Sequence, residues 1–511
     1  MSRLILPVFF SLFLNSVLGQ ETFSKVFDHA NQELTDEGKN IEETDFGYIV
    51  FDVGFNEDLL ARQGVRGIDF QGNSLFFEEH GENNYRQFCG WANSGVKTQD
   101  GNFIIGSSAH HISEDSVSNP VLFKISPSGE LLDSFRRPSE ETTIGHSAIE
   151  LEDGRYLWIG GTNDTPNGYA GAHLLMFSSE FELEWEQTYL GGGAKSLIGY
   201  SAVEVNEGGW IIGCYGWDNS TFGDCEDLKY DSDPVLVKVD ADGNEVWREE
   251  FGNCTSECGA HVATTTDGNY LFSSCKKTDA PVVQDIYGVF PYVVKFDSNG
   301  DTIWERTYGD YNGETVLTKV AELTDGNIIS GGYRYAAGAN TAHRWGLLIK
   351  LNQQGDSLWY RKYKFADDTQ CFFRDVIETS DGGFAACGRT WPSEENSSID
   401  TWVVKTDEYG CIIPGCHIGV EEFTEKYGSF KVGPNPVSQS ENLVVFLPDV
   451  KDLSGLSFQL RNLSGQLVKS FTPDEGGTSY LLRMDDVTKG MYVLSLLKDG
   501  VQVQSEKIVV N

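Results

Sequence analysis

Short apolar segments alternate with polar turns along most of the chain, and their order repeats. Two apolar segments joined by an Asp-Gly or Asn-Gly turn come first, and a loop leads to a third segment ending in Lys-x-Asp. A second glycine turn then leads to a segment that opens on an aromatic residue. The clearest copies are AVEVNEGGWIIGCY…PVLVKVDADGNEVWREEFG from Ala202 and HVATTTDGNYLFSS…PYVVKFDSNGDTIWERTYG from His261. Both central residues of such turns tolerate positive φ, so each copy predicts four short strands joined by tight hairpins.

The glycines of the first turn count the copies. They are spaced by 53 to 60 residues, and a repeat of this length with four strands is typical of a β-propeller with one blade per repeat. The seven glycines are Gly47, Gly101, Gly154, Gly208, Gly268, Gly326 and Gly382. The pattern therefore predicts an all-β fold with a seven-bladed β-propeller over residues 20–417.

An aromatic residue lies four positions after the second-turn glycine in most copies. These aromatics are Phe76, Trp247, Trp304 and Trp359. The third copy keeps the aromatic as Trp185 but has Phe181 where the glycine is expected. We interpret the aromatic as a wedge between neighbouring blades, because a packed Trp contributes a few kcal/mol to stability.

The last copy lacks its fourth strand. After TWVVKTDEYG the chain continues as CIIPGC, whereas ETFSKVFDHA from Glu21 is similar to DTIWERTYGD from Asp301. We therefore expect the N-terminal segment to close the ring, with Phe23 in the aromatic position. Closure leaves no unpaired sheet edge between the first and last blades.

The N-terminal segment predicts the cellular location of the protein, and the net charge disfavours some classes of partner. Residues 1–19 read as a secretory signal, with Arg3, the apolar run LILPVFFSLFL and small residues at the end. A membrane anchor is the alternative, but that run is shorter than the roughly 20 residues of a spanning helix. No other stretch predicts a transmembrane segment. The formal net charge of −39 disfavours nucleic acid and anionic membranes as partners.

The ten cysteines fit an oxidising compartment. Their positions predict the pairs Cys411–Cys416, Cys214–Cys225 and Cys254–Cys258. The pairing of four others stays open: Cys89, Cys275, Cys371 and Cys387. We expect no metal site, since the chain has no pair of Cys-x-x-Cys units and its histidines are scattered.

The repeat stops near Gly428, and residues 430–511 alternate apolar and polar positions between turns. This pattern predicts a small C-terminal β-sandwich, with residues 418–429 as a linker. Four elements follow in order: Pro434-Asn435-Pro436, LSGQLV, KGMYVLSL with Gly490 and Tyr492, and EKIVV with Lys507.

These elements resemble the type A C-terminal sorting domain, which directs proteins of Bacteroidetes to the type IX secretion system. The resemblance implies that the type IX secretion machinery is a partner. It further implies a secreted or outer-membrane surface location, where such sorting domains are commonly removed and the cargo is released or fixed to lipopolysaccharide.

The loops divide between the two faces of the predicted ring. The first–second and third–fourth turns are tight, whereas the second–third loops and the connections between repeats are long. We call the side with these longer segments the long-loop face and place a binding site there, because function concentrates on loops carried by a rigid scaffold. The candidate ligand-binding residues are Tyr215, Trp217, Tyr230, Tyr287, Tyr333, Arg334, Tyr335, Trp345, Arg389 and Trp391.

Aromatic rings stack on sugar faces and arginine binds polar groups, so these residues favour a glycan or a protein ligand. The alternative is that the aromatics pack against their own loops.

Two segments resemble known motifs but do not match them fully. DSNGDTIW departs by one residue from the Asp-box of sialidases. DADGNEVW lacks the threonine and one residue of the tryptophan-docking repeat of quinone-dependent dehydrogenases.

We assign no catalytic residue and no cofactor. Two hypotheses lead: a secreted or cell-surface recognition protein, which we favour, and an extracellular carbohydrate-active enzyme, a lyase or glycoside hydrolase on a propeller scaffold. A third is that the propeller is only a spacer within a larger surface assembly.

Overall fold

The computed structural model describes residues 20–511 apart from 28–35, 56–59, 91–93, 114–116, 139–141, 167, 193–194, 219–231, 252–259, 284–285, 310–314, 336–343, 367–368, 393–397, 414–415, 417–429, 448–455, 463–466, 474–478 and 499–500. The chain divides into two compact units, Met1–Gly410 and Cys411–Asn511. The elements of both units are β-strands, so the all-β prediction is confirmed. The predicted signal and linker lie outside the described residues. In the described part of the chain, no helix has the length and apolar character needed to cross a membrane.

The described residues of the first unit form seven antiparallel sheets. The first contains β2 (Glu37–Thr44), β3 (Gly47–Phe55), β4 (Ala61–Asp69) and β5 (Ser74–His80). The second contains β6 (Tyr85–Cys89) and β7 (Gly95–Lys97), which both pair with β8 (Phe103–His111), and then β9 (Ser118–Ile125) and β10 (Leu131–Arg136). The third contains β11 (Thr143–Glu150), β12 (Tyr156–Thr162), β13 (Gly171–Phe177) and β14 (Leu183–Leu190).

The other four sheets follow in chain order. The fourth contains β15 (Lys195–Glu204), β16 (Trp210–Asp218), β17 (Ser232–Val239) and β18 (Glu245–Glu250). The fifth contains β19 (His261–Thr264), β20 (Tyr270–Val283), β21 (Ile286–Phe296) and β22 (Thr302–Thr307). The sixth contains β23 (Thr315–Glu322), β24 (Ile328–Tyr335), β25 (Arg344–Leu351) and β26 (Ser357–Tyr363). The seventh contains β27 (Thr369–Glu378), β28 (Phe384–Pro392), β29 (Asp400–Thr406) and, at its outer edge, β1 (Phe23–Phe27).

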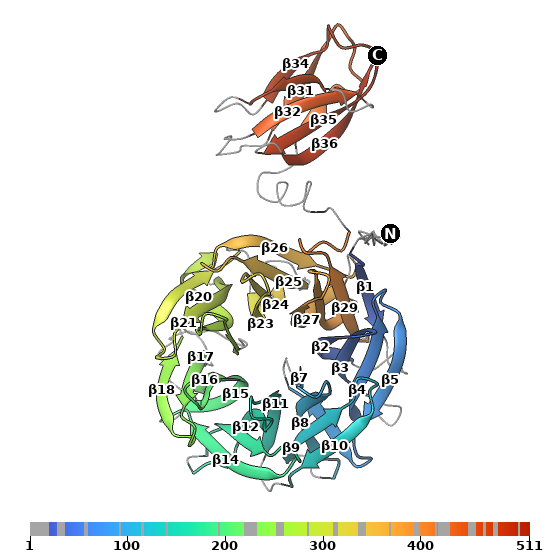
Figure 1. Cartoon of the computed structure of the whole chain (residues 1–511). Coiled ribbons are helices and arrows are strands. Elements are labelled where there is room, and N and C mark those ends of the chain that lie inside the picture. Colours follow the sequence, from blue (N-terminus) through green and yellow to red (C-terminus); the bar gives the residue numbers. More distant parts are fainter. Residues whose placement is uncertain are drawn as a thin grey trace, which may run out of the picture. The chain divides into compact units, whose positions relative to one another are not determined.

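Successive sheets follow one another around a ring, with the first strand of each sheet toward the centre and the last at the rim (Figure 1). Middle strands such as β12 are buried along their whole length, whereas rim strands such as β10 are mostly exposed. The hydrophobic clusters lie between neighbouring sheets; one joins Leu157 and Leu174 of the third sheet to Ile212 and Val237 of the fourth. Apolar burial between sheets is therefore the main stabilising contribution.

The repeated Lys-x-Asp is explained by two local contacts. The lysine pairs with the acidic residue of the first turn in the same sheet, as in Lys295 with Asp267 at 2.6 Å and Lys405 with Asp381 at 3.0 Å. The aspartate caps the second turn: Asp240 Oδ1 accepts hydrogen bonds from the backbone N–H groups of Asp242 and Asn244. These carboxylates therefore have a structural role within the repeat.

Each rim aromatic packs on the second-turn glycine of the next sheet. A Cβ added to Gly129 would lie 2.6 Å from Phe76, and one added to Gly243 would lie 2.2 Å from Trp185. The indole of Trp304 also donates a hydrogen bond to the Gln353 carbonyl, at 3.1 Å. This contact requires glycine twice over, because the turn needs positive φ and the ring leaves no room for a side chain.

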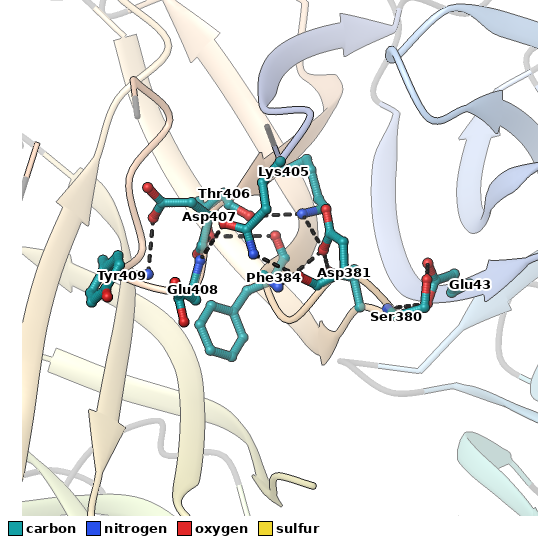
Figure 2. A network of polar contacts seen from close by, with 12 residues as sticks. Glu43, Ser380, Asp381, Phe384, Lys405, Thr406, Asp407, Glu408 and Tyr409 are labelled. Atoms are coloured by element: carbon teal, nitrogen blue, oxygen red, sulfur yellow. Dashed lines mark hydrogen bonds and ion pairs between the residues drawn. The ribbon is translucent and has the colours of Figure 1, made fainter. Parts of the chain in front are cut away.

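The N-terminal strand belongs to the same series of contacts. β1 pairs antiparallel with β29, with Phe23 opposite Lys405. The Phe23 ring lies over Gly72 of the first sheet, 2.8 Å from where a Cβ would be. Figure 2 shows the polar contacts at this junction, where Glu43 accepts a hydrogen bond from the Ser380 backbone and Lys405 pairs with Asp381 at 3.0 Å.

The second turn of the third sheet has Phe181 where the other sheets have glycine, and the preceding sheet explains this difference. Among the described residues it is the non-glycine residue with positive φ, +61°. The equivalent rim position of the preceding sheet is Asp133, so the aromatic found at this position in other sheets is missing here. The Phe181 side chain is buried and packs on Tyr156, with ring centroids 5.3 Å apart. We infer that it fills the space that the missing aromatic leaves.

A double-mutant cycle tests this account. We expect Asp133→Trp alone to destabilise the chain, because its indole would meet the Phe181 ring, and Phe181→Gly alone to remove a buried side chain. Combined, they restore the aromatic–glycine pair, so denaturant unfolding should show a favourable coupling of at least about 1 kcal/mol. Strictly additive effects would contradict the account.

The second unit contains two sheets in its described residues. One contains β30 (Lys431–Gly433), β31 (Asn442–Phe446) and β34 (Ser479–Arg483); the other contains β32 (Leu456–Asn462), β33 (Leu467–Phe471), β35 (Gly490–Lys498) and β36 (Val501–Val510). Side chains from both sheets share one hydrophobic cluster. Among the sorting-motif residues, the Asn435 side chain accepts from the Val509 N–H at 2.9 Å and donates to the Lys507 carbonyl at 2.5 Å. The Asn435 side chain thus connects the segment around Pro434 and Pro436 to the terminal strand β36 through hydrogen bonds.

Candidate ligand-binding site

Several inner strands contain a β-bulge near the long-loop face. Register shifts leave one extra residue in each of β2, β11, β15 and β27. These residues are Lys39, His146, Tyr200 and Arg374. A bulge redirects a side chain and is common beside functional sites. Polar side chains are therefore held on buried strands of the ring.

Glu37 of β2 joins three of the cations near these bulges. Its Oε1 atom pairs with Arg374 Nε at 2.5 Å, and its Oε2 atom pairs with Lys39 Nζ at 2.7 Å and an Arg389 terminal nitrogen at 3.3 Å. Glu37, Lys39 and Arg374 are each at least nine-tenths buried, while the Arg389 side chain is 21% exposed. The pairs link the first and seventh sheets.

Aromatic rings from the sixth and seventh sheets cover these arginines. Phe372 stacks on Trp391, with ring centroids 5.2 Å apart, and contacts Tyr333 at 4.1 Å. The Arg389 guanidinium carbon lies 4.8 Å from the Phe372 centroid, and that of Arg344 lies 5.0 Å from it. Cation–π contacts of this kind fix the guanidinium planes. We call Glu37, Lys39, Tyr333, Arg344, Phe372, Arg374, Arg389 and Trp391 the arginine–aromatic cluster.

Charge and burial shift the pKa values in the cluster. Burial alone would raise the pKa of Glu37, but the positive charges of Arg374, Lys39 and Arg389 outweigh it and hold that pKa well below its ordinary value. Burial lowers the pKa of Lys39, and Arg374 and Arg389 lower it further against the opposing effect of Glu37. The pKa of Arg389 is lowered by burial and by its two arginine neighbours, while Glu37 acts against them. The positive charges of Lys39, Arg374 and Arg389 are thus held close together around the carboxylate of Glu37.

A second group of buried charges adjoins the cluster. Asp375 accepts hydrogen bonds from the Asn40 side chain at 2.5 Å and the Ile41 backbone at 3.0 Å, and pairs with Lys319 at 3.3 Å. Burial, followed by the charge of Asp375, raises the pKa of Glu42 to about 7. These groups belong to first strands and link the first, sixth and seventh sheets.

The structure brings together three of the predicted ligand-binding residues: Tyr333, Arg389 and Trp391. Arg334 is directed elsewhere, to the Tyr360 hydroxyl at 3.2 Å. Trp345 lies beside two lysines, Lys362 and Lys364.

The other predicted residues lie in the fourth and fifth sheets or outside the described part. Tyr215 contacts Trp217, with ring centroids 6.2 Å apart, and Trp217 also borders a small hollow with Lys195, Asp233 and others. Tyr230 lies outside the described residues, as do the side chains of Tyr287 and Tyr335.

Five cluster members were not predicted from the sequence: Glu37, Lys39, Arg344, Phe372 and Arg374. The sequence contains a signal for one of them, because Arg374, followed by Asp375, is a charged residue in the middle of the otherwise apolar segment TQCFFRDVIE. A charge on a buried strand needs a partner, and that need could have drawn attention to Arg374.

A separate pocket of about 260 Å³ lies between the second and third sheets. It is lined by Asp164, His173 and Glu186 together with Arg137, which pairs with Glu186. His173 donates to or accepts from the Thr188 hydroxyl at 2.8 Å, and burial lowers its pKa to about 4, followed by the effect of Arg137. The imidazole is therefore neutral near pH 7. Among the described residues, no group of three His, Cys, Asp or Glu side chains is placed to hold a metal ion.

The cysteines require one correction. Cys411 and Cys416 form a disulfide, as predicted, whereas Cys214 is a free buried thiol, so the predicted Cys214–Cys225 pair is wrong. Cys214 lies two residues after Ile212, and strand alternation puts both side chains in one hydrophobic cluster. Its side chain therefore faces the core and not the following loop.

The structure describes the state of three of the four cysteines whose pairing the sequence left open. Cys371 and Cys387 are also free and buried, and Cys275 is disulfide-bonded. Cys225, Cys254 and Cys258 lie outside the described residues, and so does the side chain of Cys89.

Comparison with known proteins identifies the second unit. Residues 431–511 match the family model described as the secretion system C-terminal sorting domain. The chain therefore carries the sorting domain that marks proteins for export through type IX secretion to the cell surface or the extracellular space. A comparison with curated protein sequences finds no match.

Solved structures similar to the chain include a β-propeller domain. The β-propeller domain of the Trilobed protease from Pyrococcus furiosus is 10% identical, with a TM-score of 0.39, and the match covers 77% of this chain and 99% of that one. The GH93 α-L-arabinofuranosidase of Fusarium graminearum is 11% identical, with a TM-score of 0.40 and coverage of 63% and 95%. The plexin A4 extracellular region is 8% identical, with a TM-score of 0.42 and coverage of 94% and 53%. Similarity at this level carries no information about activity.

Proposed function

We propose that the first unit is a seven-bladed β-propeller closed by β1, and that the second is a β-sandwich reached through a linker at residues 418–429. The order of the seven sheets and the aromatic–glycine contact that β1 makes with the first sheet support the ring. The hydrophobic cluster shared by two sheets supports the sandwich.

We propose further that the chain is an exported recognition protein that binds an extracellular glycan or protein through its long-loop face. The arginine–aromatic cluster carries this proposal. It places the partly exposed Trp391, Arg344 and Arg389 at the ends of β28 and β25 near the long loops. Partly exposed aromatics held by buried neighbours offer rigid contact surface at little entropic cost.

A carbohydrate-active enzyme is the second candidate. The pocket with Asp164 and Glu186 favours it, because a pair of carboxyl groups flanking a bond is the arrangement used for glycoside hydrolysis. The ion pair between Glu186 and Arg137 argues against it, because a general acid must carry a proton, whereas this carboxylate pairs with a cation.

Binding to a glycan array, followed by incubation with the bound glycans, separates the candidates. We expect binding without new chain ends, and a loss of at least about tenfold in affinity for Trp391→Ala, since truncation of an aromatic hot spot typically costs about 2 kcal/mol or more and about 1.4 kcal/mol is tenfold. Tyr409→Ala is the matched control, because Tyr409 is an exposed aromatic on a tight turn. Cleavage products that depend on Glu186 would support the enzyme instead.

A further inference from the structure

The pocket between the second and third sheets lies at the long-loop face. Thr143 begins β11 and Arg137 follows β10, so both adjoin the connection between these two sheets. Asp164 follows the end of β12, in the second–third loop of the third sheet. These are the two kinds of longer segment that define the long-loop face. The pocket is separate from the arginine–aromatic cluster, whose residues belong to the first, sixth and seventh sheets.

His173 is held in place within this pocket by two contacts. Its Nδ1 atom lies 2.8 Å from the Thr188 hydroxyl on the neighbouring strand, and its ring lies edge-on to the buried Trp158, with centroids 6.2 Å apart. Burial lowers the pKa of His173 to about 4, and a neutral imidazole has one donor and one acceptor nitrogen. Because Nδ1 is bonded to Thr188, the nitrogen left for a ligand is Nε2, which has no partner among the described residues.

Other polar groups of the pocket are also available to a ligand. Gln187 and Asp164 are exposed, and in the described part of the chain no hydrogen bond or ion pair involves the Gln187 amide or the Asp164 carboxylate. Arg137 and Glu186 pair with each other, and that pair still leaves N–H donors and carboxylate lone pairs unused. The pocket therefore offers both donors and acceptors.

This mixture favours a neutral ligand with several hydroxyl groups. Two carboxylates and one guanidinium line the pocket and His173 is neutral, so charge disfavours an anion. A hydroxyl group both donates and accepts, which suits amide, imidazole and carboxylate partners together. The volume of about 260 Å³ lies just below the roughly 300–1,000 Å³ of sites for drug-sized ligands. One sugar unit therefore has the appropriate size and chemistry.

We propose that this pocket binds one neutral sugar unit of an extracellular glycan, with His173 Nε2, the Gln187 amide and the Asp164 carboxylate on its hydroxyl groups. This inference rests on the proposed recognition function and adds to it a second binding site and a ligand class. Because Glu186 is paired with Arg137, the bound sugar is held and not cleaved.

Calorimetric titration of the full chain at pH 7 with mannohexaose, xylohexaose, cellohexaose and laminarihexaose tests the proposal, and hexagalacturonate is the acidic comparison. We expect at least one neutral oligosaccharide to bind, at least tenfold more tightly than hexagalacturonate. Its affinity should be the same at 50 and 300 mM NaCl, because the ligand carries no charge that salt would screen. Tighter binding of hexagalacturonate, or no binding of the four neutral oligosaccharides at millimolar concentration, would overturn the proposal.

Variants of exposed side chains locate the bound sugar. Gln187→Ala should weaken binding about fivefold, as expected for one lost hydrogen bond, and Asp164→Ala/Gln187→Ala should weaken it at least tenfold. The matched control is Gln354→Ala, at an exposed glutamine on a tight turn of the sixth sheet. Asp164→Asn should weaken binding less than Asp164→Ala, since the amide still bonds a hydroxyl. Complete loss in Asp164→Asn would indicate a cationic ligand and contradict the neutral one.

The outcomes separate this inference from the recognition function. If Trp391→Ala abolishes oligosaccharide binding and Asp164→Ala/Gln187→Ala leaves it unchanged, recognition stands and this pocket is not the site. If no glycan on the array binds either, the recognition function fails together with the inference. New reducing ends that disappear in Glu186→Gln would show cleavage in the pocket and overturn a purely binding role.

Discussion

A chain that lacks residues 20–27 will lose most of its stability. Deletion removes the strand β1 from β29 and exposes one edge of the seventh sheet. It also removes Phe23 and Phe27, which are 6% and 9% exposed, and burial of each such ring contributes about 2–3 kcal/mol. Because whole domains are stable by only about 5–15 kcal/mol, we expect a drop of more than 10 °C in melting temperature or failure to fold.

Point variants and an added peptide separate the loss of the β1 contacts from a nonspecific effect of the deletion. Phe23→Ala should cost about 3 kcal/mol or more, as for other buried Phe→Ala changes. Lys25→Ala, at the exposed position of the same strand, should change the free energy of unfolding by less than about 0.5 kcal/mol. A synthetic peptide of residues 20–27 added to the deleted chain should raise its melting temperature in proportion to its concentration. An unchanged melting temperature in the deleted chain would show that β1 does not close the ring.

The position of Phe23 shows how much of the fold the sequence contains. Repeated turns and aromatics were readable because each copy uses local chemistry: a glycine with positive φ, an aspartate that caps its own turn and an aromatic at a fixed distance. Even the exception at Phe181 was visible in the sequence. Its cause was not, because it depends on Asp133, which belongs to a different sheet, and only the order of the sheets around the ring relates the two positions.

The candidate site was less predictable, for two physical reasons. Glu37 and Arg374 are 337 positions apart in the chain, and no local pattern links them. In addition, the bulges in β2 and β27 add one residue to each strand, so alternation no longer predicts which way Lys39 and Arg374 point. Tyr333 and Trp391 were found because aromatics beside long loops are visible without knowledge of side-chain direction. For Cys214 the alternation was regular, and counting from Ile212 would have placed its thiol in the core.

Replacement of Glu37 by Gln should be the most damaging single polar substitution in the ring. The change leaves Lys39, Arg374 and Arg389 close together without the carboxylate that pairs with all three. Removing one partner of a buried ion pair typically costs about 3–5 kcal/mol, which denaturant unfolding at pH 7 measures directly. Glu82→Gln is the matched control, because the pair of Glu82 with Arg136 is largely exposed and such pairs contribute about 0–1 kcal/mol.

The pH dependence of the unfolding free energy is a second test of the ion pairs that Glu37 makes. Because the folded pKa of Glu37 is lowered from an ordinary value near 4.5, its stabilisation is fully present above that value and is lost as the pH falls below it. The difference in unfolding free energy between the wild type and Glu37→Gln should therefore be constant from pH 8 to 5 and shrink toward pH 3. The double variant Glu37→Gln/Lys39→Met should be more stable than Glu37→Gln alone, since it removes one of the unpaired charges. If instead Glu37→Gln cost no more than the Glu82 control, the cations would be neutralised by another group, and the cluster would not depend on Glu37 for its geometry.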